Sequence, residues 1–146
     1  MARPRVKRQH SPGESVPARL GRAGVRAGVV GYAAFVAYMS LKPFRDVPLD
    51  LAIDRIGRAY LHLPAYAVLG ALVFVVLPER GRRWRRAFLA FLAAAGYGWA
   101  LEVAQIPAPT RSFNLTGLVF DALGAALGAA AALGFAAWRR RSRRSV

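Results

Sequence analysis

The sequence lacks cysteine and has few acidic or imidazole side chains. Without cysteine, the chain can form no disulfide, no thiolate-bound metal site and no cysteine nucleophile. It has only two histidines, and His10 lies far along the chain from His62, so a zinc site would lack enough ligands. We therefore predict neither a metal site nor a cofactor.

Positive charge, in contrast, is abundant, with 22 Lys and Arg against seven Asp and Glu and a formal net charge of +15. A nucleic-acid-binding surface would interleave such charges with aromatic side chains along one face. Here the charges flank long uncharged runs, and 55% of the residues are hydrophobic, which is above the share usual in soluble domains. We therefore predict an integral protein of the cell membrane that contacts membrane lipids and not nucleic acid.

Four apolar runs are predicted to form transmembrane helices: 27–41, 62–77, 87–106 and 113–138. The first run covers only about 22 Å at 1.5 Å per residue, against a hydrocarbon core of about 30 Å. Arg26 and Lys42 can extend their charges into the headgroups and lengthen it. Because a long basic tail precedes this run and no A-x-A-like cleavage site follows it, we expect a retained span rather than a signal peptide.

The basic residues also predict the orientation of these helices. The two tails and the loop after the second run hold 17 Lys and Arg, whereas the two other connectors hold five. Such an excess marks the cytoplasmic side, so both termini are predicted to lie inside (N-in/C-in). The fold class is therefore an all-α membrane protein with a four-transmembrane-helix bundle.

The chain divides into three predicted parts. Residues 1–26 form a basic cytoplasmic tail, disordered because Pro4, Pro12 and Pro17 disfavour a continuous helix. Residues 27–138 form the transmembrane domain, and residues 139–146 form a second basic cytoplasmic tail. Within the domain, the apolar residues of segment 43–61 recur at helical spacing, which predicts a short helix on the outer membrane surface.

Polar side chains gather at the predicted outer ends of the helices. Glu102 and Asp121 lie within apolar runs, where an isolated carboxylate costs about 2.5–3.5 kcal/mol, so each is expected to face a partner inside the bundle. Gln105 shares a helix face with Glu102, and Arg111 follows in a proline-containing loop from which it can reach either carboxylate. Two interpretations stay open: Arg111 neutralises the carboxylates and fixes the hairpin, or the group binds a ligand or catalyses a reaction.

Two further motifs also have two interpretations each. His62 and Tyr66 lie one helical turn apart, and His62 is either a proton-transfer group or an interfacial histidine with a satisfied hydrogen bond. Gly124 and Gly128 form a G-x-x-x-G pattern, which lets helices approach closely either within the bundle or across a homodimer.

The order of these residues resembles the VanZ-like membrane proteins. His62, Tyr66, Leu69 and Gly70 match the family's H-x-x-x-Y-x-x-L-G segment, and Glu102 with Gln105 matches its E-x-x-Q. Arg111 follows six residues after the glutamine, and ten residues later Asp121 and Gly124 stand in the family's N-x-x-G positions.

The chain departs from the family pattern at two places. Gly117 stands where the family commonly has Asp, and Asp121 stands where it has Asn, so the carboxylate is shifted by one helical turn. Arg58 replaces the acidic residue expected shortly before His62, with Asp54 one turn earlier.

The resemblance implies a cell-envelope protein related to one associated with resistance to glycopeptides such as teicoplanin, and it supplies no reaction. Our first hypothesis is that the outer polar cluster binds an envelope lipid, peptide or glycolipid. The candidate ligand-binding residues are His62, Tyr66, Glu102, Gln105, Arg111 and Asp121. The alternative is a small membrane enzyme acting on a lipid-linked substrate, with Glu102 or Asp121 as general acid or base and His62 as proton shuttle. Whether the chain is an enzyme stays open.

Overall fold

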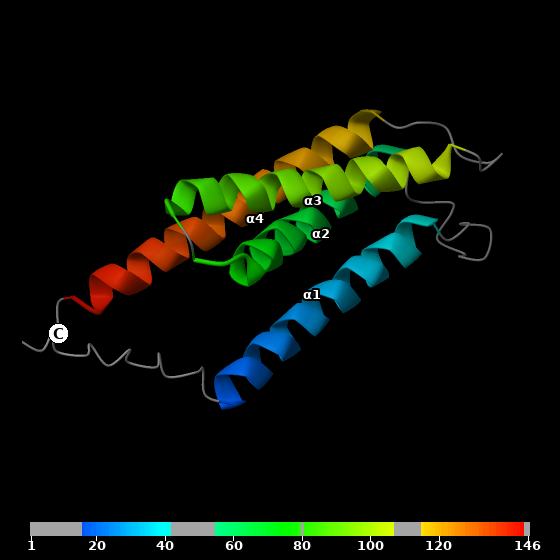
Figure 1. Cartoon of the computed structure of the whole chain (residues 1–146). Helices are drawn as coiled ribbons and strands as arrows, with labels where there is room; N and C mark the ends of the chain where they lie inside the picture. Colours follow the sequence, from blue (N-terminus) through cyan, green and yellow to red (C-terminus); the bar gives the residue numbers. More distant parts are fainter. Residues whose placement is uncertain (1–15, 42–54, 80, 107–114, 145–146) are drawn as a thin grey trace, which may run out of the picture.

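The computed structural model describes residues 16–41, 55–79, 81–106 and 115–144, of which 16–20, 22 and 55–59 are described by their backbone alone. These residues form four helices: α1 (Val16–Leu41), α2 (Arg55–Val76), α3 (Arg83–Gln105) and α4 (Leu115–Ser142). Figure 1 shows α2, α3 and α4 packed together, with α1 lying along one side of them. The all-helical class predicted from the sequence is confirmed.

The four helices alternate in direction along the bundle. Gln105, at the end of α3, bonds to Ser40 at the end of α1, so these two helices run in the same direction. Arg86, at the start of α3, bonds to Phe74 at the end of α2, so α3 runs opposite to α2. The turn between them uses Gly81 at φ 82°, a left-handed conformation that suits glycine.

Small residues allow α2 and α4 to pack most closely. Gly124 lies against the backbone of Leu63, and Gly128 lies against the backbone of Ala67, so neither position has room for a Cβ. Ala125 and Ala129 on the same face of α4 are buried. The G-x-x-x-G motif therefore lets α2 and α4 pack closely within the chain, which was one of its two interpretations. A homodimer through Gly124 and Gly128 stays a prediction.

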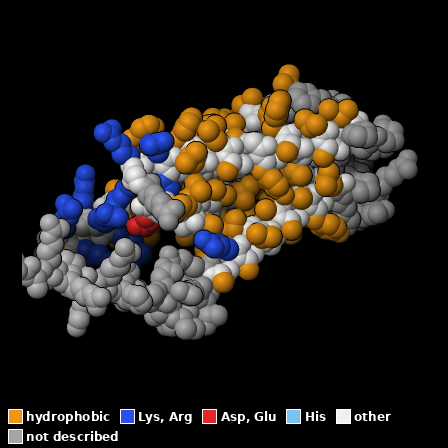
Figure 2. Space-filling view, in the orientation of Figure 1, with side chains coloured by type: hydrophobic (Ala, Val, Ile, Leu, Met, Phe, Trp, Pro, Cys, Tyr) orange, Lys and Arg blue, Asp and Glu red, His pale blue; other side chains and the backbone are white. Residues whose placement is uncertain are grey.

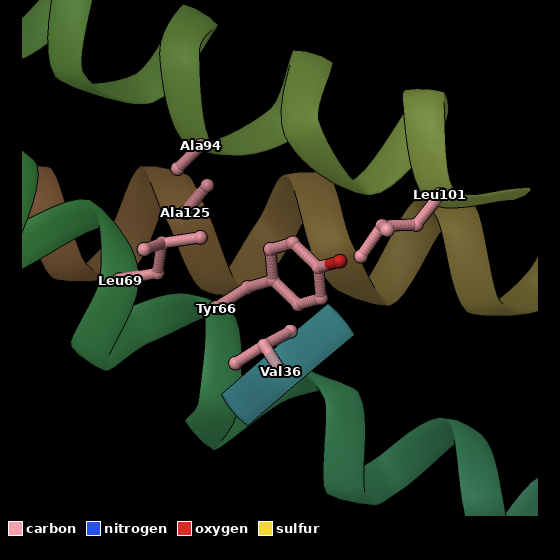
Figure 3. Close-up of a cluster of buried hydrophobic side chains, with 6 residues drawn as sticks. All are labelled: Val36, Tyr66, Leu69, Ala94, Leu101 and Ala125. Atoms are coloured by element: carbon pink, nitrogen blue, oxygen red, sulfur yellow. The ribbon is translucent and has the colours of Figure 1, made fainter. Parts of the chain in front are cut away.

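The core is centred on one aromatic ring. Figure 3 shows the Tyr66 ring among Val36, Leu69, Ala94, Leu101 and Ala125, residues that come from all four helices. Many large hydrophobic side chains point away from this core; among them Val30, Phe35, Leu92 and Leu127 are each close to half exposed or more. In a membrane protein such a surface faces lipid, because burial in hydrocarbon needs no protein neighbour.

Three of the helices are long and apolar enough to cross a membrane: α1 through its segment Ala23–Leu41, α3 and α4. The apolar part of α2, Tyr60–Val76, is shorter. The whole of α2 nevertheless has 22 residues, about 33 Å at 1.5 Å per residue. The predicted count of four spans and their orientation therefore stay predictions.

The helices extend past the ends of the predicted transmembrane domain, and the division of the chain into 1–26, 27–138 and 139–146 stays a prediction. α1 begins at Val16, inside the tail predicted to be disordered, and Pro17 is tolerated there because the first turn has no backbone donors to lose. α4 continues through three arginines to Ser142, so much of the predicted tail 139–146 is helical. The predicted surface helix 43–61 lies partly outside the described residues, and its last part, from Arg55, is continuous with α2.

Candidate functional site

A histidine and an aspartate bridge α2 and α4 near the start of both helices. Nδ1 of His62 lies 2.8 Å from Oδ1 of Asp121. Asp121 is 1% exposed, whereas 32% of the His62 side chain is exposed. A buried carboxylate thus holds an accessible imidazole in one orientation, as expected for a charged group that needs a partner inside an apolar bundle.

Tyr66 extends this pair one helical turn deeper. Its ring stacks on that of His62, with the centroids 6.2 Å apart and the planes 10° from parallel. Tyr66 is 2% exposed, and its ring lies next to the second oxygen of Asp121, because both groups occupy the space in front of Gly98 on α3. A methyl group at Gly98 would lie 2.7 Å from Oδ2 of Asp121 and 2.9 Å from a Tyr66 ring carbon.

Glu102 completes the group from the next turn of α3. It is 6% exposed and lies one helical turn after Gly98, the residue that the Tyr66 ring and the Asp121 carboxylate approach. We call His62, Tyr66, Glu102 and Asp121 the histidine cluster, and the end of the bundle where it lies the polar end. Its members come from three helices and were all candidates from the sequence, but their mutual contacts were not predicted.

Gln105 and Arg111 were predicted to join the same site. The Gln105 amide nitrogen donates instead to the backbone oxygen of Ser40 at 3.0 Å, which ties the end of α1 to α3. Arg111 lies outside the described residues, as does Asp54, and Arg58 is described by its backbone alone, so the predicted pairing of Arg111 with a carboxylate stays a prediction.

Two tyrosines that were not among the predicted site residues attach α1 beside the cluster. The Tyr97 hydroxyl donates to the Ala33 oxygen at 2.6 Å, and the Tyr32 hydroxyl donates to the Ala65 oxygen at 3.0 Å. Ala65 directly precedes Tyr66 in α2. Tyr97 likewise directly precedes Gly98 in α3, so α1 is bonded to both helices at the depth of the cluster.

The part of the chain that the structure describes contains no group of three or more His, Cys, Asp or Glu side chains arranged to hold a metal ion. The cluster instead places an imidazole, a phenol and two carboxylates within an apolar bundle, with the imidazole partly exposed. Such groups can form hydrogen bonds to a polar ligand or transfer protons.

The family model for VanZ/LLP1 matches residues 21–137, which include nearly all of the four helices and the whole histidine cluster. The chain belongs to the VanZ/LLP1 family. No curated protein and no solved structure shows a significant match to it. It is accordingly a VanZ-like membrane protein, with helices of the length and composition needed to cross a bilayer.

One of the two departures expected from the VanZ-like resemblance involves Asp121, a member of the histidine cluster. Gly117, where the pattern has Asp, is buried one turn before Asp121 on α4. Asp121, where the pattern has Asn, carries the carboxylate that bonds to His62. The α4 face turned toward His62 thus carries a carboxylate at Asp121 and a glycine one turn earlier.

Proposed function

We propose that this VanZ-like protein is a multi-pass protein of the cell membrane that binds a polar envelope molecule at its polar end. The ligand class is an envelope lipid, a peptide or a glycolipid, and its binding lowers sensitivity to teicoplanin-type glycopeptides. The observation that carries the proposal is the 2.8 Å bond from the partly exposed His62 to the buried Asp121.

The physical basis is preorganisation. A side chain whose orientation is already fixed loses little conformational entropy when it bonds to a ligand. Asp121 is buried and cannot readily be contacted by a ligand, so His62 is the member of the pair that presents a polar edge. Tyr66 supports the imidazole by stacking, which restricts its rotation further.

The same bond favours one second candidate, a small membrane enzyme acting on a lipid-linked substrate. A carboxylate bonded to Nδ1 of a histidine fixes the ring and stabilises its protonated form, which is the arrangement used by histidine general bases. In this candidate His62 transfers the proton and Asp121 orients it, while Glu102 is the second acid or base.

The test is expression of the chain in a teicoplanin-susceptible bacterium, with His62→Gln and Asp121→Asn as the variants. We expect the chain to raise the teicoplanin concentration that inhibits growth, and each variant to abolish the increase at unchanged protein level. Thr116→Val, which removes an exposed hydroxyl near the start of α4, is the matched control and should retain the effect. Normal resistance in both cluster variants would contradict the proposal.

Mass spectrometry of the purified protein separates the two candidates. If the chain is a binding protein, the purified protein should carry its envelope ligand intact, and the His62→Gln variant should lose that ligand. An enzyme should convert a lipid-linked substrate when incubated with an envelope lipid extract, and His62→Gln should leave it unconverted. Arg111→Lys and Glu102→Gln test in the same assays whether those residues join the site.

A further inference from the structure

At the opposite end of the bundle, a cavity of about 420 Å³ lies among basic side chains. We call this end the basic end. Figure 2 shows arginine side chains gathered there, with acidic atoms among them, while hydrophobic side chains cover most of the helical surface in view. The arginines that line the cavity are Arg83, Arg86, Arg139, Arg140 and Arg143, and the other lining residues are Phe74, Glu79, Gly81 and Ala136.

Hydrogen bonds to backbone oxygens hold two of these arginine side chains, Arg83 and Arg86, in place. Arg86 donates to the backbone oxygens of Phe74 and Val75 at 2.6 and 2.9 Å, and its guanidinium lies 4.4 Å from the centre of the Phe74 ring. Only 11% of its side chain is exposed. Arg83 donates to the Ala136 oxygen at 3.2 Å. These bonds join the ends of α2, α3 and α4 and keep two positive charges in place at the cavity.

Glu79 supplies the negative charge within this cavity. Its two carboxylate oxygens lie 3.3 Å from Arg86 and 3.5 Å from Arg140, and 72% of its side chain is exposed. Ion pairs at such distances and exposure contribute little free energy, so an external anion can displace Glu79 at small cost. Five arginines against one glutamate leave the lining with a surplus of positive charge.

The depth of the cavity in the membrane follows from the aromatic side chains at the same end. Trp84 lies in the first turn of α3 and Trp138 directly precedes Arg139 in α4, and both are more than half exposed. Indoles in such positions mark the boundary between hydrocarbon and headgroups. The anion available at that level in a membrane is the phosphate of a lipid headgroup.

We propose that this cavity binds the phosphate of an anionic phospholipid. Arg139, Arg140 and Arg143 bond to the phosphate from α4 and the residues after it, and the fixed charges of Arg83 and Arg86 stand behind it. Basic pockets between helix ends are suited to lipid headgroups for this electrostatic reason. The site is separate from the histidine cluster, so it does not depend on the function proposed above.

The experiment measures binding of fluorescently labelled phosphatidylglycerol to the purified full chain in neutral detergent. The double variant Arg140→Gln/Arg143→Gln should bind about tenfold more weakly than the unaltered protein. Its matched control, Arg85→Gln/Arg144→Gln, removes the same charge from two exposed arginines that do not line the cavity, and should change affinity less than about threefold. Equal losses in the two double variants would mean diffuse attraction and would overturn the proposal.

Two further measurements test the proposal even if the Arg140→Gln/Arg143→Gln variant folds poorly. Glu79→Gln removes the competing carboxylate and should bind the lipid about threefold more tightly; weaker or unchanged binding contradicts the proposed displacement. Inorganic phosphate tests the source of the anion. Displacement of the lipid by phosphate at equimolar concentration would assign the cavity to a free anion and overturn its assignment to a lipid.

Discussion

At Gly98, the Asp121 carboxylate and the Tyr66 ring occupy the space that a side chain would need. We predict that Gly98→Ala destabilises the protein by about 1–3 kcal/mol, because the carboxylate is held by His62 and the ring is buried on all sides. The measurement is unfolding of the purified protein by dodecyl sulfate in mixed micelles.

Gly96→Ala is the control for this prediction. Gly96 lies two residues earlier in α3, is exposed, and has no atom within 4 Å of an added Cβ. Since alanine favours a helix more than glycine does, this variant should be neutral or slightly more stable. Similar stability of the two variants would show that the packing of Asp121 and Tyr66 over Gly98 is wrong.

The His62–Asp121 pair gives a second prediction at the same scale. His62→Leu leaves a buried carboxylate without its imidazole and should cost about 3 kcal/mol of unfolding free energy. The double variant His62→Leu/Asp121→Leu removes both polar groups and should recover at least half of that loss. A double variant less stable than His62→Leu alone would contradict the pairing.

The sequence predicted which residues form the site better than how they contact one another. His62, Tyr66, Glu102 and Asp121 stand out because polar side chains within apolar runs are costly and need partners. Their pairing depends on how α2 and α4 are rotated about their own axes, which spacing along one helix does not determine. The sequence did not indicate that Gly98 belongs to the site. Gly96 and Gly98 both lie in an alanine-rich helix, and only the positions of the neighbouring helices distinguish them.

At the scale of the elements, the contact between α2 and α4 depends on the glycines of α4. Gly128→Ala should lower the unfolding free energy by about 2 kcal/mol or more, because the Ala67 backbone occupies the position of the new methyl group. Gly134→Ala on the same helix meets no atom within 4 Å and should be neutral. The dodecyl sulfate assay measures both, and equal stability would contradict the close packing of the two helices.

Helix boundaries were predicted less well than helix existence. The apolar runs located all four helices, but α1 and α4 both extend past the charges that end their runs. Arginine favours a helix nearly as much as leucine does, so a charge ends the hydrocarbon span without ending the helix. At 28 residues, α4 is about 42 Å long, which is enough to carry its terminal arginines beyond the hydrocarbon core.

For the whole molecule, the alternating directions of the helices place the start of α1 and the end of α4 at the same end of the bundle. That four helices span the membrane with both termini inside stays a prediction. A reporter fused after Leu49 should then be active only outside the cytoplasm, and one fused after Ser142 should be active only inside. The physical reason is the placement of 17 of the 22 basic residues in the two tails and the second connector. A cytoplasmic reporter after Leu49 would contradict this topology.

The bond between His62 and Asp121 also has a consequence for biogenesis. Synthesis from the N-terminus makes α2 before α4, so the imidazole is already present when the carboxylate of the last helix leaves the ribosome. An aspartate costs an isolated apolar helix about 2.5–3.5 kcal/mol during insertion, and an earlier helix can offset that cost at the translocon. Integration of α4 should therefore depend on residue 62, and a nascent chain with leucine there should leave its last helix outside the bilayer more often.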